Sequence, residues 1–374
     1  MSDLTPPFRA DHVGSLLRPA SIVEARKKHF QDKSISAEEL KAVEDQAIPD
    51  LIKMQEEVGL KAVTDGEARR FFWHYDFMGM LDGLDIIKRD EGGSFKGFQG
   101  VALPPVFPVI NSKLDFPADH PMLEHFKFVK EHTNVVPKIS IPGPSCCHFR
   151  VAPEDITVKE YQEDVEELFA DLAATYKKAV QAFYDVGCRY LQMDDIFFAY
   201  LCDPKHRAAK AEAGQDPDWL IDRYSWMMRE AIKDRPADMH IGMHMCRGNF
   251  RSTHAAEGAY DQAAEAIFAT GVDIFFMEYD TDRAGGLEPL KLLPKGKQRV
   301  LPGFITTKTP ELEDIDWLKS KFDEASKYCD IDQLGIAPQC GFASTEEGNA
   351  VTYDDQRRKL ELVVKTAETI WGEV

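Results

Sequence analysis

The chain has 374 residues, of which 44% are hydrophobic and 29% are charged, as is ordinary for a globular protein with a large core. Its 45 basic residues minus 64 acidic residues give a formal net charge of −19, which argues against a nucleic-acid partner because phosphate contacts need a positive surface. No apolar stretch is long enough to span a membrane, and seven cysteines without the dense spacing of a disulfide scaffold favour reduced thiols, so we expect a cytoplasmic protein.

Short apolar runs alternate with amphipathic stretches along the chain. Eight runs are expected to be strands: FRADHV near residue 8, AVTDGE near 62, KISIPGP near 138, YLQMDD near 190, HIGMHMC near 240, VDIFFME near 272, RVLPGFIT near 299 and LGIAPQ near 334. Each run is short and largely apolar, which is typical of parallel strands covered on both faces.

The stretches between these runs predict helices. Ser36 and Glu39 form a capping-box pattern that opens a helix over 36–58. Apolar residues recur every three or four positions over 155–186, which predicts one amphipathic helix ending before Gly187. Other helices are predicted over the ranges 219–233, 255–269, 311–328 and 353–371, with a shorter one at GGLEPLKLL.

This alternation predicts an α/β fold, a single (β/α)8 TIM barrel that takes in residues 1–374 as one catalytic domain. Residues 83–135 are the main irregularity, being too long for one loop and too often broken by Pro and Gly for a helix. We expect them to form an excursion inserted between the second and third units, with short strands of its own or a lid.

Four residues at the ends of predicted strands suggest a zinc site. His244 and Cys246 lie two apart on one strand and so share a face, while Glu278 and Cys340 follow two other strands. Each cysteine taken alone is more often a small buried hydrophobe than a ligand. Together the four offer the imidazole, thiolate and carboxylate ligands that zinc accepts. Such an electron-rich ion suits a third, substrate thiol held as a nucleophilic thiolate, which indicates alkyl transfer to sulfur.

Several motifs in combination resemble those of a known family. They are DHVGSLLRP at the start, VTDGEARR on the second unit, LQMDD on the fourth, HxC on the fifth, the strand-end Glu on the sixth and PQCGF on the eighth. The chain resembles the zinc-binding C-terminal barrel of cobalamin-independent methionine synthase, and more closely the short single-barrel members of that superfamily.

The resemblance implies roles for individual residues. It implies that His244, Cys246, Glu278 and Cys340 bind the catalytic zinc, that Ser15 receives the carboxylate of homocysteine, and that Glu67 and Asp194 hold its ammonium group. The residues alone leave alternatives open, because Ser15 could cap a turn and Glu67 could join Arg69 or Arg70 in a surface ion network. Asp194 and Asp195 end an apolar strand, where two carboxylates need a compensating cation.

Three departures from the family concern the methyl donor. Lys308 stands where the family has a proton-relaying histidine, Tyr200 replaces a glutamate that meets the pterin ring, and the N-terminal barrel of the long synthases has no counterpart. We expect Tyr200 in the substrate pocket and Lys308 to neutralise an anionic donor or leaving group, with Asp194 as the second candidate catalytic residue.

The function expected from these residues is zinc-dependent methyl transfer to a small thiol, with homocysteine favoured and the donor left open. One alternative is zinc-dependent epoxide opening with coenzyme M, whose sulfonate would need an arginine; another is a non-catalytic zinc–thiol binding protein. The candidate arginines are Arg18, Arg70, Arg150, Arg247 and Arg283. For Cys146 and Cys147 we favour buried packing over substrate contact.

Overall fold

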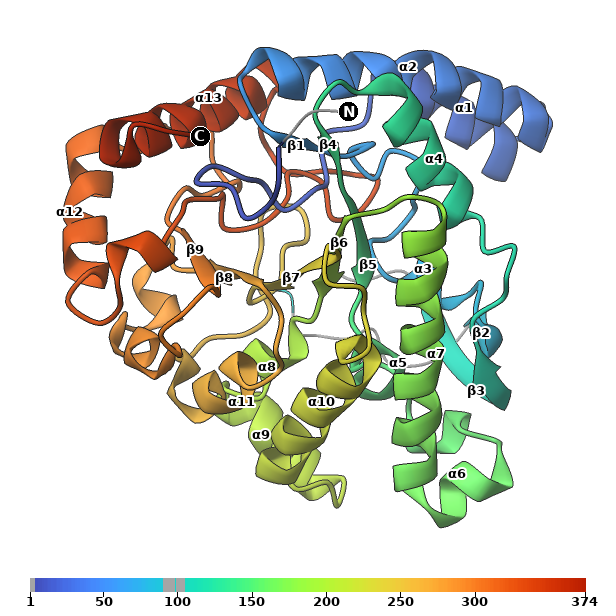
Figure 1. The fold of residues 1–374 in the computed structure, drawn as a ribbon. Helices are drawn as coiled ribbons and strands as arrows, with labels where there is room; N and C mark the ends of the chain where they lie inside the picture. Colours follow the sequence, from blue (N-terminus) through green and yellow to red (C-terminus); the bar gives the residue numbers. More distant parts are fainter. Residues whose placement is uncertain (1–3, 90–97, 99–104) are drawn as a thin grey trace.

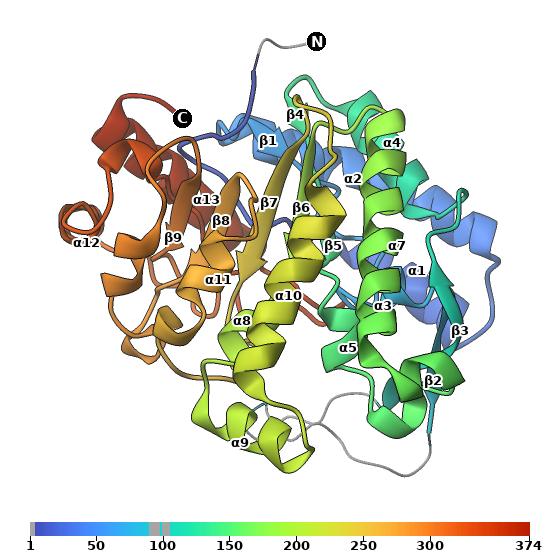
Figure 2. The ribbon, with the colours of Figure 1, turned by 60° about the horizontal axis from the view of Figure 1, so that its bottom comes forward.

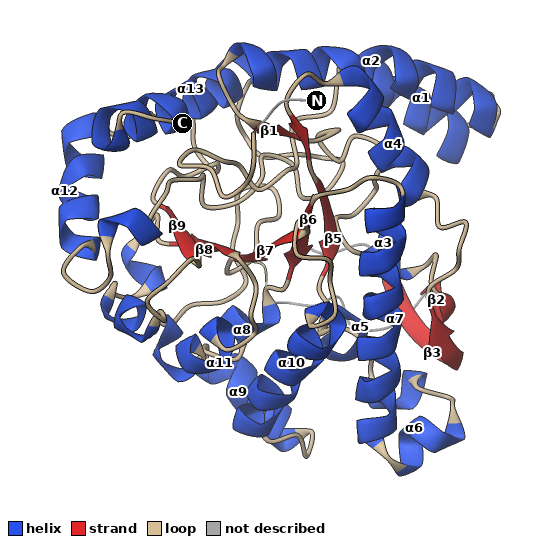
Figure 3. Ribbon diagram, in the orientation of Figure 1, coloured by secondary structure: helices blue, strands red, loops and turns tan. Residues whose placement is uncertain are grey.

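The computed structural model describes residues 4–89, 98 and 105–374. The parallel strands lie at the centre of the molecule with helices around them, and one antiparallel pair lies at the outer edge, so the predicted α/β fold is confirmed (Figures 1 and 3). No helix among the described residues is both long and apolar enough to cross a membrane.

A parallel five-stranded sheet forms the largest part of the centre, in the order β5-β6-β7-β8-β9 (Figure 2). Its strands are β5 (Ile139–Pro142), β6 (Tyr190–Asp194), β7 (His240–Met245), β8 (Ile274–Glu278) and β9 (Arg299–Gly303). A second parallel pair joins β1 (Ala62–Val63) to β4 (Val136–Pro137). Lys138 lies between β4 and β5, and its N–H donates to the carbonyl of Val63 over 2.8 Å, so the two sheets are continuous through this strand.

The first and eighth expected strands are not strands in the structure. Residues near 8 and 334 make only isolated parallel bridges, Ala10 to Ile336, Val300 to Leu334 and Ile305 to Pro338. Pro6 and Pro7 before the first segment and Pro338 in the second have no N–H to donate, which limits the ladder that either segment can form. Among the described residues, no ladder joins the segment near Ala10 to β1, so a closed hydrogen-bonded barrel is not formed.

Helices cover the outside of the strands. Two match the sequence closely: α2 (Ala37–Glu57) begins with the predicted capping box of Ser36 and Glu39, and α13 (Tyr353–Trp371) spans the predicted range. The remaining α-helices are α1 (Ala20–Phe30), α3 (Tyr75–Met78), α4 (Met122–His132), α5 (Cys146–Phe149), α6 (Lys159–Glu163), α7 (Val165–Asp185), α8 (Phe197–Tyr200), α9 (Pro204–Glu212), α10 (Pro217–Ile232), α11 (Ala264–Phe268) and α12 (Ile315–Ala325).

Two helix predictions are wrong in part. The helix expected over 155–186 is interrupted at Asp164, which is extended at φ −144° and caps α7 by accepting from the N–H of Glu166 over 3.0 Å. The helix expected over 255–269 is reduced to α11, because Ala255 donates its N–H to the carbonyl of Arg247 over 2.8 Å rather than along a helix. Gly187 ends α7 at φ 97° as predicted.

The expected excursion contains an antiparallel pair, β2 (Asp82–Lys88) with β3 (Val106–Asp115), followed by α4. Residues 90–97 and 99–104 of the expected excursion lie outside the described residues. The assignment of the whole chain to one domain with this insertion stays a prediction.

Two apolar clusters position the polar strand ends. A small cluster that includes Tyr190, Phe276 and Leu301 gathers side chains from the sheet segments themselves, and a much larger one lies between the strands and the helices. Alternate residues of a strand point to opposite faces, so the residues at positions 190, 192 and 194 share one face of β6. Inward-facing polar residues at the carboxyl ends of β6 and β7 therefore meet one another.

Candidate active site

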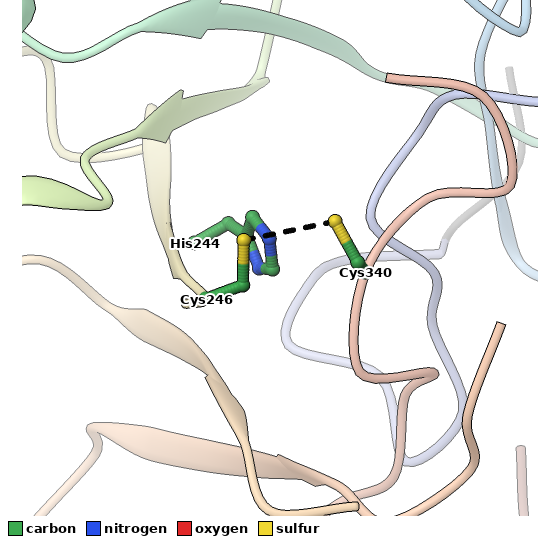
Figure 4. Close-up of side chains that lie close together, drawn as sticks. All are labelled: His244, Cys246 and Cys340. Atoms are coloured by element: carbon green, nitrogen blue, oxygen red, sulfur yellow. Dashed lines mark hydrogen bonds between the residues drawn. The ribbon is translucent and has the colours of Figure 1, made fainter. Parts of the chain in front are cut away.

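Three residues at the carboxyl ends of strands form a group able to bind a metal ion. The ligand atoms of His244, Cys246 and Cys340 all lie within 4.8 Å of one another, and all three side chains are buried. His244 and Cys246 project from the end of β7 towards Cys340, which comes from the loop after Pro338 (Figure 4). Neither ring nitrogen of His244 has a hydrogen-bond partner among the described residues. Unpartnered buried nitrogens beside two thiols fit the donor set of zinc.

The two thiols of this group share one hydrogen bond, between Sγ atoms 3.8 Å apart. This contact lowers the pKa of Cys340 well below that of an ordinary thiol and raises the pKa of Cys246 well above it. One of the two thiols therefore ionises readily, but a nearby cation is needed to keep both sulfurs in the thiolate form.

Glu278 ends β8 close to this group but does not belong to it. Its carboxylate forms an ion pair with Arg283 and accepts a hydrogen bond from the N–H of Arg247 over 2.5 Å. Burial alone would raise the pKa of Glu278, but Lys308, Arg283 and Arg247 outweigh it and lower the pKa to about 2. Glu278 is thus ionised and held by arginine, and its role as a fourth zinc ligand stays a prediction.

Lys308 lies beside the same group. Its Nζ is buried and has no hydrogen-bond partner among the described residues. Lys308 is not among the residues that line the pocket beside the metal-binding group. The Lys308 charge helps to lower the pKa of both Glu278 and Cys340, so its effect on the site is electrostatic.

One pocket opens beside the metal-binding group. Eight of the residues singled out in the sequence line it: Ser15, Glu67, Arg150, Asp194, Tyr200, His244, Cys246 and Cys340. They come from segments far apart in the chain, and the fold brings them together.

Glu67 is built into the wall of this pocket. It has a left-handed backbone at φ 55°, which is uncommon for a residue other than glycine and is typical of functional sites. Its Oε1 accepts from the hydroxyl of Ser140 over 2.7 Å, while the buried Oε2 has no partner among the described residues. Burial raises the pKa of Glu67. The alternative of an ion network is correct for Arg70, whose Nη1 lies 3.6 Å from Oε1 of Glu67, but wrong for Arg69, which pairs with Glu44 over 3.0 Å. The Glu67–Arg70 pair is buried and so does not lie at the surface.

Asp194 faces the pocket and is held by a neighbour on its own strand. The side-chain amide of Gln192 donates to Oδ1 of Asp194 over 2.7 Å and to the carbonyl of Val13 over 2.6 Å. Burial raises the pKa of Asp194 to about 7. The sequence reasoning missed Gln192, although its position two residues before Asp194 on one strand face was a usable signal.

Ser15 lies against the loop that carries Cys340. Its carbonyl accepts from the N–H of Phe342 over 2.9 Å, and a side chain at Gly341 would lie only 1.8 Å from the Ser15 hydroxyl. Glycine at position 341 therefore allows this close approach.

The rest of the pocket wall is largely aromatic and was not singled out beforehand. It includes Phe72, Trp73, Phe98, Phe250 and Asn249. The amide of Asn249 donates to the carbonyl of Gly341 over 2.9 Å, and its buried Oδ1 has no partner among the described residues. Asn249 and Phe250 lie three and four residues after Cys246 of the HxC motif, so their nearness in sequence was the available signal.

The candidate arginines differ in their surroundings. Arg150 is the one of the five that the described wall of the pocket includes. Arg18 donates to the carbonyl of Ala343 over 2.6 Å and Arg247 to that of Ala284 over 3.0 Å, so these guanidinium groups bind main chain.

Cys146 and Cys147 are buried and do not line the pocket. Cys146 Sγ lies 3.7 Å from the carbonyl of Asp194, and Cys147 Sγ lies 3.8 Å from the hydroxyl of Tyr176. Burial raises the pKa of both thiols, which suits packing rather than nucleophilic reaction.

Comparison with known proteins shows the family of this chain. The family model "Cobalamin-independent synthase, Catalytic domain" matches residues 10–369. The uncharacterized protein YxjH of Bacillus subtilis (strain 168) is 42% identical over 367 residues, which cover 98% of this chain and 95% of that protein. A crystal structure of the putative vitamin-B12 independent methionine synthase from Listeria monocytogenes is 41% identical, with a TM-score of 0.79 and coverage of 99% of this chain and 100% of that one.

A more distant structure shares the fold. It is a B12-independent methionine synthase from Shewanella sp. W3-18-1 in complex with selenomethionine, which is 19% identical, with a TM-score of 0.73 and coverage of 97% of both chains.

Proposed function

This chain belongs to the cobalamin-independent synthase family, and we propose that it is a zinc-dependent enzyme that transfers a methyl group to the thiol of homocysteine, giving methionine. The observation that carries the proposal is the group of His244, Cys246 and Cys340 beside a pocket with buried acids on its wall. A metal-binding site next to carboxylates that can bind an ammonium group suits an amino acid with a thiol side chain.

His244, Cys246 and Cys340 would hold the zinc ion, with Glu278 as the fourth ligand that the family resemblance implies. When bound, the ion stabilises a substrate thiol as the thiolate, which is the nucleophilic form. Because an aliphatic thiol is mostly protonated at neutral pH, this stabilisation supplies reactivity that the free thiol lacks.

Glu67 and Asp194 would hold the ammonium group of the substrate, and Ser15 would receive its carboxylate. The unpartnered Oε2 of Glu67 supports this role, since a buried carboxylate oxygen without a partner costs free energy until a donor arrives. The Shewanella protein was solved in complex with selenomethionine, an amino acid with the same two polar groups.

Lys308 and Asp194 are the proposed catalytic groups. The buried ammonium of Lys308 would offset negative charge that develops as the donor leaves. Tyr200 would contact the substrate or donor from the pocket wall.

We also propose a single (β/α)8 barrel over residues 1–374, with the excursion at 83–135. The parallel bridges at Ala10 and Ile336 support it, because they continue the strand order beyond β9. The location of the site at the carboxyl ends of β6 and β7 is typical of such barrels. All seven cysteines are free, which supports a reducing, cytoplasmic setting.

Metal analysis of purified variants tests the site. We expect about one zinc ion per chain, the usual load of a site with one ligand set, and severe loss of zinc in His244→Ala and in Cys340→Ser. Cys329→Ser is the matched control, since Cys329 is a free cysteine that is not part of the metal-binding group. Full zinc occupancy after removal of both His244 and Cys340 would contradict the proposal.

A thiol-consumption assay separates the enzyme from its alternatives. Loss of the free thiol of homocysteine in the presence of methyl donors supports methyl transfer. Arg150 on the pocket wall gives the coenzyme M alternative a specific candidate, so the same assay is run with 2-mercaptoethanesulfonate and small epoxides. A protein that binds zinc and thiol but consumes neither thiol with any donor would be the non-catalytic binder.

A further inference from the structure

Cys340 is the member of the metal-binding group that lies on a loop. His244 and Cys246 project from the end of β7, whereas Cys340 comes from the loop opposite (Figure 4). The last parallel bridge before Cys340 joins Ile305 to Pro338. Contacts of the residues after Cys340 therefore decide how firmly its thiol is held beside the other two ligands.

The side chain of Asn249 binds the loop after Cys340 to the turn after Cys246. Its Nδ2 donates to the carbonyl of Gly341 over 2.9 Å and lies 3.4 Å from the hydroxyl of Ser344. That hydroxyl in turn lies 3.7 Å from Sγ of Cys340. A side-chain amide has two N–H donors, so Asn249 can bind both positions of the loop at once. It thereby joins the two segments that carry the thiols.

A second donor at the Gly341 carbonyl is shared with another acceptor. The hydroxyl of Thr307 lies 3.0 Å from this carbonyl oxygen and 2.7 Å from Oε1 of Gln339. A hydroxyl has one hydrogen, so it cannot donate to both acceptors. Asn249 has one N–H for each of its contacts, which makes it the main donor to Gly341.

The turn that carries Asn249 is itself fixed by backbone hydrogen bonds. The carbonyl of Arg247 accepts from the N–H of Ala255 over 2.8 Å. Phe250 and Thr253 exchange backbone hydrogen bonds of 3.2 and 2.9 Å. The position of Asn249 is therefore set within its own turn, so its amide can hold the Cys340 loop in place.

The orientation of the Asn249 amide follows from its contact with Gly341. A carbonyl oxygen only accepts hydrogen bonds, so Nδ2 and not Oδ1 faces it. Oδ1 is buried and has no hydrogen-bond partner among the described residues. Aspartate has the same shape but no N–H, and at position 249 it would set a carboxylate against the carbonyl oxygen. Asparagine therefore serves this loop as a donor.

We propose that Asn249 is a positioning residue of the metal-binding group, which keeps the thiol of Cys340 where one ion can bind it together with His244 and Cys246. The inference rests on the zinc binding proposed above and names a residue that completes that site. Replacing residues that orient metal ligands typically lowers metal affinity by about 10–100-fold, so the contribution of Asn249 is measurable.

Titration of the full chain, freed of metal, with Co²⁺ tests the inference, because Co²⁺ accepts nitrogen and sulfur ligands and its thiolate absorption reports the sulfur bound to each ion. We expect Asn249→Ala to bind Co²⁺ about 10–100-fold more weakly, with the thiolate absorption per bound ion reduced towards that of a site with one sulfur. A variant that is merely less stable would bind less ion with an unchanged spectrum per bound ion, and that result would overturn the inference.

Asn249→Asp separates the donor from the shape of the side chain. It should lose thiolate absorption per bound ion as Asn249→Ala does, because it also lacks the N–H groups. A spectrum equal to that of the unmodified protein would contradict the inference. This variant also decides the matter if Asn249→Ala does not fold, as judged by circular dichroism.

Asn349→Ala is the matched control. The buried amide of Asn349 donates to the carbonyl of Thr307 over 3.0 Å, so the variant loses a comparable hydrogen bond away from the Cys340 loop. Its spectrum per bound ion should equal that of the unmodified protein, and an equal change in both alanine variants would count against Asn249. Absence of thiolate absorption from the unmodified protein would end the metal site and this inference together. A spectrum that depends on Asn249 without methylation of homocysteine by any donor would support the inference while ending the proposed function.

Discussion

At the scale of single residues, buried polar atoms without partners mark where a ligand belongs. Oε2 of Glu67, Oδ1 of Asn249 and both ring nitrogens of His244 have no hydrogen-bond partner among the described residues, and all three side chains line one pocket. Leaving such atoms unpaired costs about 1–3 kcal/mol each, so their gathering around a pocket indicates that substrate or metal completes them.

Glu67→Gln tests whether the carboxylate of Glu67 binds the ammonium group of homocysteine. The variant keeps the length of the side chain and can keep the hydrogen bond from Ser140, but it loses the charge. We expect homocysteine to bind more weakly by about 1.5–3 kcal/mol, the range of a charge-assisted hydrogen bond. Calorimetry with 4-mercaptobutanoate, which lacks the amine, is the control. Equal losses of binding free energy for both thiols would show that Glu67 does not bind the amine.

At the scale of elements, the two acidic side chains at the end of β6, Asp194 and Asp195, point to opposite faces of the sheet. Asp194 faces the pocket, whereas Asp195 faces α5, where the hydroxyl of Ser145 donates to its Oδ1. Oδ2 of Asp195 is buried without a partner among the described residues, and burial raises the pKa of Asp195 to about 7. No cation compensates this second carboxylate in the described structure, so the strand end is less stable when Asp195 is ionised.

The pH dependence of stability follows from this shift. Between the unfolded pKa of about 3.9 and the folded pKa of about 7, the unfolded chain loses the Asp195 proton and the folded chain keeps it, so stability falls as pH rises through this window. We expect Asp195→Asn to be more stable than the unmodified protein at pH 8, by on the order of 2–4 kcal/mol, with little difference at pH 4.

Urea unfolding of the metal-free protein at both pH values measures the effect, because protonation of the histidine and cysteine ligands would release zinc at pH 4. Asp234→Asn is the matched control, because Asp234 is exposed and pairs with Lys177 at the surface. An equal change in stability at pH 4 and pH 8 would contradict the linkage.

At the scale of the whole molecule, the buried ion pair of Lys138 and Asp11 joins the N-terminal segment to the sheet. Lys138 Nζ lies 2.6 Å from Oδ1 of Asp11, and both side chains are at most 1% exposed. Oδ2 of Asp11 accepts from the hydroxyl of Tyr190 over 2.5 Å, and the Lys138 ammonium lies 5.0 Å from the ring centre of Phe276. This network holds the segment that continues to Ser15 in place where no ladder joins it to β1.

Lys138→Met removes one partner of that pair. We expect a loss of about 3–5 kcal/mol of unfolding free energy, because the carboxylate of Asp11 is left buried without its counter-ion. Lys178→Met is the control, since its pair with Asp115 is exposed and should contribute about 0–1 kcal/mol. Urea unfolding curves give both values, and similar small losses in the two variants would show that the buried pair does not fasten the segment.

The sequence by itself determined the features that depend on near neighbours. The capping box at Ser36, the limits of α13 and the apolar runs of β5 to β9 follow from residues a few positions apart, because helix caps and strand periodicity are local. The HxC motif likewise placed His244 and Cys246 on one strand face.

The tertiary structure alone decided what depends on residues far apart in the chain. The segments near 8 and 334 resemble strands in composition, yet among the described residues they make only isolated bridges, and the prolines in and beside them cannot donate to a ladder. Five arginines looked equivalent in sequence, and the folded structure brings only Arg150 of the five to the described wall of the pocket. The tertiary fold determines which distant residues become hydrogen-bond partners, and local sequence patterns do not reveal these long-range pairings.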